Sequence, residues 1–412
     1  VLHVESQPRG DRPDFPPQGD PAAVNNIDER STAANGSGAA AGYPPMYYFP
    51  AAVLYEVSSG PLLHRIEVMR LWSIALGVVA AWLTLLIGRR LFRGHEAAAV
   101  ALAVACLVQP ELSQQTAVVN NDALVIAAGA ACLLAALDLT RPSGRRSRWL
   151  CGLAGAALGM AMFKSFGVVF APVLLLAWLI GRARTPKPER IRLWREVGQT
   201  VAGIGVTLGA WMAYAAAFGF HGASLADINP SPGPKDLRTY LHVLRRHWFH
   251  QLRVNWIDQL WGDFSYVNTP FPTWVQGTIL VITLLTIALV IAWAAKTGLA
   301  FLRARRRTAA GVRDEPGVDH TANMVVCIAA IAATFAFFLI AGYLNYHRTG
   351  RNDLIQGRYA LMLLPAIVAL PALALRTLRP RISALVPTLV AAGALVMLNI
   401  GGVALVVERF YL

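Results

Sequence analysis

QPELSQQTAVVNND, residues 109–122, is a polar stretch between two apolar runs, 97–108 and 123–139. Each run is apolar enough for a membrane-buried helix, so the polar stretch is predicted to form a hairpin at a membrane face. It has no lysine or arginine, and its acidic and asparagine residues are Glu111, Asn120, Asn121 and Asp122. Acidic and amide groups gathered at the end of a helix bundle favour a functional site over a plain linker.

The composition is that of a membrane protein. Of 412 residues, 56% are hydrophobic and 15% are charged, whereas soluble domains carry about 25% charged residues. A net charge of +14 is compatible with nucleic-acid binding, but the basic residues lie in short runs between apolar segments, where membrane topology concentrates them. No basic face interleaved with aromatic residues is evident, so nucleic acid is not an expected partner.

The apolar runs predict an all-α polytopic membrane protein with about ten transmembrane helices. Their ranges are 71–88, 97–109, 123–139, 149–163, 166–181, 197–218, 274–295, 321–343, 359–375 and 383–407. The four cysteines lie in or beside these runs without C-x-x-C spacing, so we interpret them as small core residues and expect neither disulfides nor zinc. No predicted helix has a charge near its middle, which argues against an ion-coupled transporter.

Positive charge is distributed unevenly between the two sides of the predicted bundle. The connections on one side hold 22 of the 37 lysine and arginine residues, which places that side in the cytoplasm under the positive-inside rule. The chain is therefore expected to start and end outside the cytoplasm. The predicted divisions are a mobile extracytoplasmic segment 1–43, a membrane core 44–218, an extracytoplasmic loop 219–273 and C-terminal transmembrane helices 274–412.

The long extracytoplasmic loop predicts an amphipathic helix. Apolar side chains recur near helical spacing from Leu237 to Leu260, with most basic residues off this stripe. Such a helix is expected to lie in the outer membrane interface, with its aromatic rings at headgroup depth.

Asp122 stands where a predicted helix begins on the outer side. A single N-cap residue satisfies the free amides there, so a cap explains only one of Asn120, Asn121 and Asp122. We interpret Asp122 as a candidate catalytic carboxylate, able to deprotonate a hydroxyl or to help hold a divalent metal ion. No other cofactor is indicated. Glu111, Asn120 and Asn121 are candidate substrate-binding residues beside it.

Two basic residues are candidate ligands for a donor phosphate. Lys164 interrupts an apolar stretch between two short predicted helices, and its alternative role is to anchor the chain at the interface. Arg358 opens a later helix in the sequence QGRY, where an arginine–tyrosine anchor is the alternative. A guanidinium here could pair bidentately with phosphate, while Gly357 permits close backbone approach. Gln356 and Tyr359 are predicted to bind substrate.

Two aromatic motifs complete the candidate substrate-binding residues. Tyr47 belongs to YPPMYY (43–48), which is predicted to be extended because a proline disfavours helix in the residue before it. Trp261 and Asp263, in WGDF, precede a predicted spanning helix. Aromatic residues in these positions are also typical of an interfacial belt, and Asp263 is a second acidic candidate.

These motifs form an ordered set: YPPMYY, VVNND (118–122), GMAMFKS (159–165), WGDF (261–264) and QGRY (356–359). The set resembles the GT-C-type polytopic membrane glycosyltransferases, nearest to bacterial relatives of protein O-mannosyltransferases and lipid A aminoarabinose transferases, over residues 43 to about 375. It matches Asp122 to an acidic position of that family, and Lys164 and Arg358 to its basic positions.

The resemblance implies transfer of a sugar from a polyprenyl-phosphate carrier to a glycan, lipid or protein acceptor. The active site would lie on the extracytoplasmic side of a bacterial plasma membrane, with membrane lipids as further partners. In such chemistry, cationic side chains stabilise the departing lipid phosphate.

That family usually begins with one more helix, followed by an acidic pair that forms its catalytic centre. Here Asp28-Glu29 does not match that setting, and the chain starts with Val1. We therefore expect the sequence to begin inside the first outer loop, with the main acidic pair upstream, which would leave the chain as given inactive. Two other functions stay open: a non-catalytic transporter or flippase of lipid-linked saccharide, and a membrane scaffold for envelope assembly.

Overall fold

The computed structural model describes residues 46–142, 148–162, 166–185, 191–218, 236–263, 269–308, 318–349, 356–379 and 381–411. Almost all of these residues with regular structure are helical. The one strand in the described ranges, β1 (Thr269–Pro270), pairs with Asp263 in an isolated antiparallel bridge. The protein is therefore all-α, as the apolar runs predict. The segment 1–43 and Lys164 lie outside the described residues.

Ten helices correspond to the ten predicted apolar runs. They are α5 (Leu62–Leu91), α6 (Glu96–Leu107), α8 (Asp122–Leu139), α9 (Arg148–Met162), α10 (Phe170–Arg184), α11 (Ile191–Phe218), α15 (Thr273–Thr308), α16 (Val318–Thr349), α17 (Leu364–Leu378) and α18 (Leu385–Tyr411). Shorter elements lie between them: α4 (Tyr48–Val57), α7 (Pro110–Ala117), the 3-10 helices η3 (Phe166–Val169) and η7 (Gly357–Leu363), α12 (Leu237–His250), the π-helix η6 (Gln251–Asp258) and α13 (Gln259–Trp261).

Seven helical segments in the described residues are long and apolar enough to cross a membrane. The bent pair α6 and α7 makes an eighth if it counts as one span. The 15-residue α9 and the longer α11 are not among these segments. The all-α polytopic membrane fold is therefore confirmed, with seven or eight helices rather than ten meeting this test.

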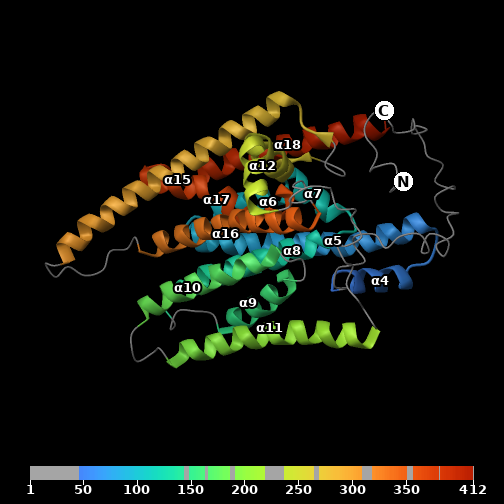
Figure 1. The fold of residues 1–412 in the computed structure, drawn as a ribbon, viewed down its shortest axis with the longest axis horizontal. Helices are drawn as coiled ribbons and strands as arrows, with labels where there is room; N and C mark the ends of the chain where they lie inside the picture. Colours follow the sequence, from blue (N-terminus) through green and yellow to red (C-terminus); the bar gives the residue numbers. More distant parts are fainter. Residues whose placement is uncertain are drawn as a thin grey trace.

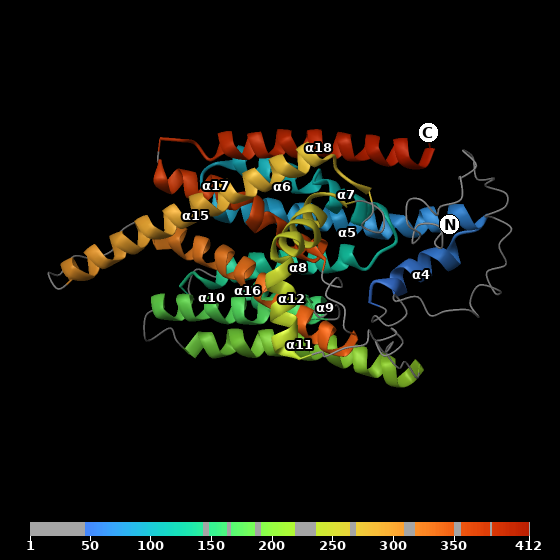
Figure 2. The ribbon, with the colours of Figure 1, turned by 45° about the horizontal axis from the view of Figure 1, so that its top comes forward.

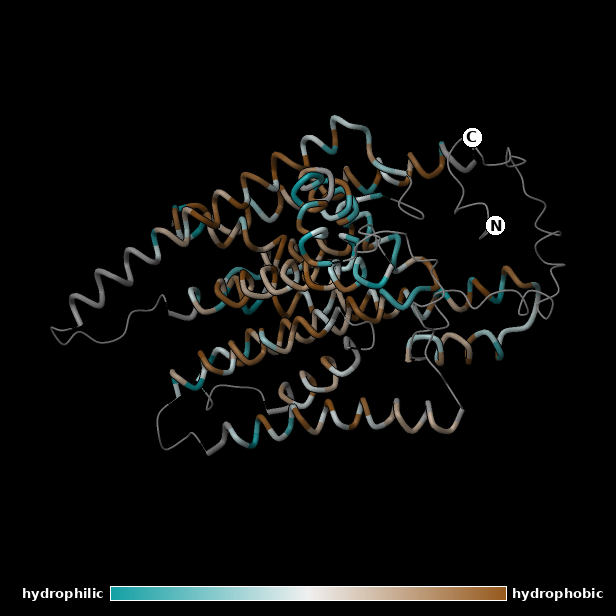
Figure 3. Tube along the Cα trace, in the orientation of Figure 1, coloured by the Kyte–Doolittle hydropathy of each residue, from teal (hydrophilic) through white to brown (hydrophobic). Residues whose placement is uncertain are grey.

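Successive long helices run in alternating directions, so the bundle has two ends (Figures 1 and 2). We name them after the predicted topology: the outer end carries α7 and the start of α8, and the inner end carries the end of α15 and the start of α16. Figure 3 shows hydrophobic residues along the helices and hydrophilic residues at helix ends and around α7 and α12. Helices α5, α10 and α17 each end in a last turn with arginine at the inner end. The basic residues thus gather as the sequence predicts, while the membrane side itself stays a prediction.

Small residues allow the helices to pack closely around α8, in which nearly every residue is buried. A Cβ added at Gly129 would lie 2.5 Å from the Cβ of Met362, so η7 approaches α8 directly. Likewise, a Cβ at Gly155 of α9 would lie 2.0 Å from the Thr200 carbonyl oxygen of α11. Close backbone approach of this kind is how helices associate in lipid, where apolar surface alone gives no preference for protein. All four cysteines are buried, as predicted for core residues.

The predicted hairpin at 109–122 contains a helix. Pro110 occupies the first turn of α7, and the Gln109 side chain caps it by accepting a hydrogen bond from Leu112 N at 2.5 Å. Proline is favoured at this position because the first helical amides have no partner within the helix. The axes of α6 and α7 differ by 63°, so α7 turns across the outer end.

The segment 237–260 is helical as predicted, but it is not one regular α-helix. The chain continues from α12 into the π-helix η6, where the Trp256 ring packs at an angle against Phe335 and Phe338 of α16 at centroid distances of 5.6 Å. Trp256 and Leu260 are buried. Aromatic burial against α16 therefore packs this segment onto the bundle, while its depth in the membrane stays a prediction.

The extended conformation predicted for YPPMYY fails at its last two residues. Tyr47 has helical backbone angles and Tyr48 begins α4. Pro50 lies in the first turn of α4, a place that tolerates proline, so it does not prevent the helix. Residues 43–45 lie outside the described ranges.

Candidate functional site at the outer end

Tyr47 joins α4 to the outer end of the bundle. Its hydroxyl lies 2.5 Å from the Ser73 hydroxyl of α5, which donates to the Val118 carbonyl at 2.6 Å. Burial raises the pKa of Tyr47, an effect that its hydrogen bond to Ser73 partly offsets. Tyr47 is 1% exposed, so it is not an interfacial belt residue. Through Ser73, Tyr47 is linked to Val118, in the turn that leads to Asn120 and Asp122.

A chain of hydrogen bonds connects Glu111 to Asp122. Gln115 donates through Nε2 to Oε1 of Glu111 at 2.8 Å. Asn120 donates through Nδ2 to Oε1 of Gln115 and, at 3.1 Å, to Oδ2 of Asp122. The two carboxylates predicted from the polar stretch therefore share one network, whose middle member Gln115 is one that sequence reasoning missed. Spacing of i and i+4 on a helix was the available signal.

The structure also resolves which residue satisfies the amides at the start of α8. Asn120 accepts a hydrogen bond from Asp122 N through Oδ1 at 3.1 Å. Asn121 occupies the N-cap position, but its side chain makes no capping hydrogen bond. Asn120 therefore takes the local structural role, and the buried Asp122 is left for interactions with other groups.

Arg358 of η7 faces the acidic residues. The carboxylates of Asp122 and Glu111 both attract the guanidinium of Arg358 electrostatically. The carboxylate of Asp263 repels that of Glu111. Four charged groups, from α7, α8, η7 and the segment after α13, are therefore close enough to interact electrostatically. The guanidinium carbon of Arg358 lies 5.8 Å from the ring centroid of Tyr359.

Several buried polar atoms at this place have no hydrogen-bond partner among the described residues. They include Oε2 of Glu111, Nε of Arg358 and Oε1 of Gln356. Glu111 lies on α7, whose polar sequence PELSQQTA places it outside the apolar part of any span. Burial raises the pKa of Glu111 to about 8, although its hydrogen bond from Gln115 and the charge of Arg358 oppose the shift.

Gln109 and Gly357 hold the elements of the site together. Nε2 of the fully buried Gln109 donates to the Leu260 carbonyl at 2.7 Å, so one side chain both caps α7 and ties it to α13. A Cβ at Gly357 would lie 2.0 Å from the Trp256 carbonyl oxygen. The close backbone approach expected at Gly357 thus occurs, but its partner is the π-helix of the protein itself. Gln109 was missed as a positioning residue, because glutamine is not among the preferred capping residues, although Pro110 is typical of a helix start.

Trp261 and Asp263 come just after Leu260, the residue that Gln109 contacts. Trp261 packs against the core, and its carbonyl lies 3.5 Å from Nε2 of Gln109. Asp263 is buried beside the bridge to Pro270. Both predicted residues therefore belong to the outer end, with the Asp263 carboxylate near Glu111 and the Trp261 ring in a packing role.

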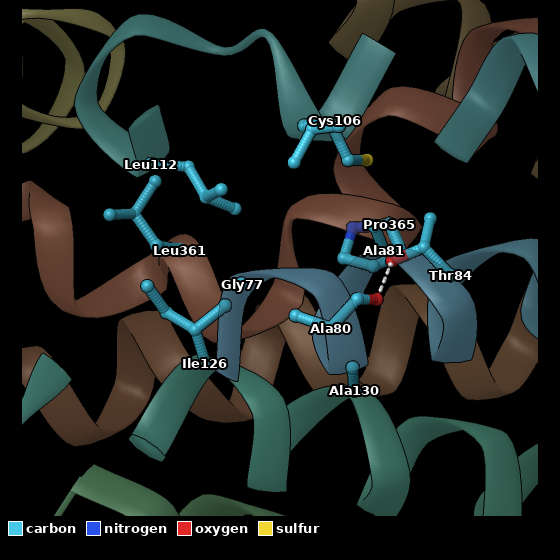
Figure 4. A pocket seen from close by; sticks show the side chains of 11 residues that line it. Gly77, Ala80, Ala81, Thr84, Cys106, Leu112, Ile126, Ala130, Leu361 and Pro365 are labelled. Atoms are coloured by element: carbon cyan, nitrogen blue, oxygen red, sulfur yellow. Dashed lines mark hydrogen bonds between the residues drawn. The ribbon is translucent and has the colours of Figure 1, made fainter. Parts of the chain in front are cut away.

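A small apolar crevice of about 10 Å³, with room for about one water molecule, lies between α5, α6, α7, α8, η7 and α17. Figure 4 shows its lining side chains, among them Leu112, Ile126 and Leu361, which follow Glu111, Asp122 and Arg358 in sequence. The Thr84 hydroxyl donates to the Ala80 carbonyl at 2.7 Å, so this polar group is satisfied within its own helix. Ile126 and Ala130 of α8 both line the crevice and are four residues apart, so it spans roughly 6 Å along that helix at 1.5 Å per residue.

No group of three or more His, Cys, Asp or Glu side chains in metal-binding proximity occurs in the part of the chain that the structure describes. The carboxylates at the outer end therefore give no preassembled three-ligand metal site in those residues.

Fold and site together define a multi-pass α-helical membrane protein with a buried cluster of charged residues at one end of its bundle. The chain belongs to the family described as predicted membrane protein (DUF2142), whose model matches residues 13–370 and so includes the whole cluster. No curated protein and no solved structure matched the chain.

Proposed function

We propose that this protein is a GT-C-type membrane glycosyltransferase, which moves a sugar from a polyprenyl-phosphate carrier to an acceptor at the extracytoplasmic face. The observation that carries the proposal is the half-buried Arg358, whose charge interacts with those of the buried Glu111 and Asp122. Nε of Arg358 and Oε2 of Glu111 have no partner in the described residues. A buried polar group without a partner costs about 1–3 kcal/mol, so the arrangement favours a ligand that supplies an anion to Arg358 and a proton donor to Glu111.

The chemistry is a single displacement at the anomeric carbon. The acceptor hydroxyl oxygen attacks that carbon, the bond from the carbon to the phosphate oxygen breaks, and polyprenyl phosphate leaves with the electron pair. Arg358 stabilises the charge that develops on the departing phosphate. A carboxylate takes the hydroxyl proton. Glu111 suits this role because a pKa of about 8 lies close to physiological pH, where a general base is most effective.

Asp122, the carboxylate predicted from the sequence, takes part through the same network. It accepts a hydrogen bond from Asn120, which also contacts Gln115 beside Glu111. We assign to Asp122 the orientation of the acceptor hydroxyl and of the network that serves Glu111. Lys164, the second predicted phosphate ligand, keeps its proposed role without support from the described residues.

The surroundings of the charged groups are compatible with a lipid-linked donor. Leu112 and Leu361, which lie one and three residues beyond Glu111 and Arg358, line a small crevice made almost wholly of apolar side chains. An anion site within an apolar helix bundle favours a polyprenyl phosphate over a soluble sugar nucleotide.

Binding of a short polyprenyl phosphate to the purified chain in detergent tests the proposal. We expect the ligand at 100 times its Kd to stabilise the wild type by about 2.7 kcal/mol. Arg358→Gln should abolish this stabilisation, and Arg358→Lys should retain part of it because a point charge without the guanidinium fork remains. Arg348→Gln is the matched control, since Arg348 is an exposed arginine near the end of α16. An unaffected Arg358→Gln variant, or no stabilisation of the wild type, would contradict the donor site.

A transfer assay in vesicles separates an enzyme from a flippase. In the proposed enzyme, Glu111→Gln should preserve donor binding and reduce sugar transfer by at least about 100-fold, the usual contribution of a general base. A flippase would instead move donor across the bilayer without acceptor, and Glu111→Gln would leave that movement intact. The second result would replace the glycosyltransferase proposal with transport.

A further inference from the structure

A second polar cluster, far from the outer site, lies where α5, α8 and α10 end. Oδ1 of Asp138, at the end of α8, lies 3.3 Å from Nη2 of Arg90 and 3.3 Å from Nη1 of Arg141. Arg184, at the end of α10, donates through Nη1 to the Thr140 carbonyl at 2.9 Å. Two arginines therefore contact one buried carboxylate, and a third is bound to the main chain two residues further on.

Asn323 of α16 closes the same cluster. It accepts from the Thr140 hydroxyl and donates to the Arg90 carbonyl, each at 3.4 Å. The helix ends are thus fixed by main-chain contacts as well as by ion pairs. This leaves the arginine side chains held in place and close together before any ligand arrives.

The cluster has more positive than negative charge in the described residues. Arg93 adds a further positive charge that acts on Arg141. The nearest exposed carboxylate in sequence, Glu96, is engaged with Arg89 at 2.8 Å. Burial and the charges of Arg90 and Arg93 lower the pKa of Arg141, while Asp138 opposes this shift. One carboxylate therefore offsets only part of the local charge.

Exposed apolar surface lies close to the cluster. Leu175 and Leu179 of α10 are exposed apolar side chains within three turns of Arg184, and α5 exposes Trp82 two turns before Arg90. The side chains of Arg90 and Arg141 are 30% and 21% exposed. They are thus accessible to a ligand at the rim of the bundle yet shielded enough for strong electrostatic attraction.

We propose that Arg90, Arg141 and Arg184 bind the phosphate headgroup of an anionic phospholipid at the inner end of the bundle. Guanidinium groups pair with phosphate oxygens through parallel hydrogen bonds. Basic side chains near a membrane surface attract anionic lipid. The lipid tails would lie along the exposed apolar faces of α5 and α10. This site is independent of the proposed glycosyltransferase site and would remain if that proposal failed.

The test compares lipid binding to the purified full chain in neutral detergent, by native mass spectrometry and by thermal shift. The probes are phosphatidylglycerol, phosphatidylcholine and inorganic phosphate. We expect phosphatidylglycerol to bind at least tenfold more tightly than phosphatidylcholine. Stabilisation by inorganic phosphate alone, at equal phosphate concentration, would overturn the lipid as the ligand in favour of a soluble anion.

Matched variants locate the binding. Arg141→Gln combined with Arg90→Gln should weaken phosphatidylglycerol binding at least tenfold, and Arg141→Gln alone should weaken it less. Arg89→Gln is the control, because it removes the same charge from the neighbouring position, where Arg89 pairs with exposed Glu96. Equal losses in the control and the double variant would overturn the site, because general surface charge would then explain the binding.

Asp138→Asn distinguishes a lipid site from a merely structural ion pair. Removal of the competing carboxylate should tighten phosphatidylglycerol binding several-fold, since lipid phosphate then takes its place between Arg90 and Arg141. A purely structural cluster predicts a less stable protein with unchanged or weaker lipid binding. That result would overturn the proposal even if the arginine variants folded poorly.

Discussion

The two ends of the bundle differ in the contacts that their charged side chains make. At the inner end, Asp138 lies within 3.3 Å of both Arg90 and Arg141. At the outer end, Arg358 interacts with Glu111 and Asp122 through their charges, but Nε of Arg358 and Oε2 of Glu111 lack hydrogen-bond partners in the described residues. The same types of side chain thus form close ion pairs at the inner end, whereas at the outer end one arginine and one glutamate each keep a buried atom without a hydrogen bond in the described residues.

The difference shows what holds each end together. The inner end depends on ion pairs, and its surplus charge is positive. The outer end depends on uncharged contacts, namely the Gln109 hydrogen bonds to Leu112 and Leu260 and the close approach of Gly357 to Trp256. A framework that leaves Nε of Arg358 and Oε2 of Glu111 without a hydrogen-bond partner in the described residues costs stability and keeps these two atoms available for a ligand, as is common where function opposes stability.

The largest effect is expected from Asp138→Ala at the inner end. It leaves two arginines without their carboxylate, and breaking a buried pair typically costs about 3 kcal/mol. We expect that loss in the free energy of unfolding, measured in neutral detergent. The exposed pair of Arg89 and Glu96 supplies the control, because Glu96→Gln should change stability by less than about 0.5 kcal/mol. Similar small effects for both variants would show that the inner end is not held by ion pairs.

Gly357→Ala tests the uncharged framework of the outer end. The new Cβ would lie 2.0 Å from the Trp256 carbonyl oxygen and 2.9 Å from Leu260 N, so backbone must move. Overpacking of this kind costs about 2 kcal/mol, and we expect a matching drop in the unfolding free energy together with weaker polyprenyl phosphate binding. Gly277→Ala in α15 is the control, since a Cβ there meets nothing within 4 Å. Equal stability of the two variants would show that the close approach of Gly357 to Trp256 does not hold the outer end together.

The sequence predicted the helical fold well because length and hydropathy decide it. Each of the ten apolar runs lies at a helix, and the arginines at the ends of α5, α10 and α17 gather as the charge distribution indicates. It was harder to predict which of these helices are long and apolar enough to cross a membrane. Helix α9 has only 15 residues and packs against α11 through Gly155 and Gly159, so its place in the bundle depends on packing rather than on length.

The candidate site was predicted in its charged members but not in its supports. Glu111, Asp122, Asp263 and Arg358 stand out in the sequence because charge is rare in apolar surroundings. Gln109 and Gln115 do not stand out, since a glutamine acquires its role only from the distant or helical neighbours that the fold supplies. The packing of residues 251–260 onto the bundle was missed for a similar reason, because the stripe of apolar residues does not reveal whether lipid or α16 covers it.

The smallest effect expected is the pH dependence that Glu111 gives to the outer end. Burial raises its pKa from 4.5 to about 8, so the folded protein binds more protons than the unfolded chain between those values. Stability is then highest below about pH 4.5 as far as this group is concerned, and it falls as pH rises through 8. From pH 7 to pH 9 the expected loss is about 1.4 kcal/mol, which corresponds to one pKa unit.

Unfolding midpoints in detergent at pH 7, 8 and 9 measure this loss. Glu111→Gln should remove the slope and be the more stable protein at pH 9, because it keeps a hydrogen-bonding group without a buried charge. Glu56→Gln, at an exposed position on α4, should keep the wild-type slope. If stability still fell with pH in Glu111→Gln, the Glu111 carboxylate would not be the source of the pH dependence. Its contacts would then stabilise its charge as well as the arginines stabilise that of Asp138, and the two ends would not differ at the proposed site.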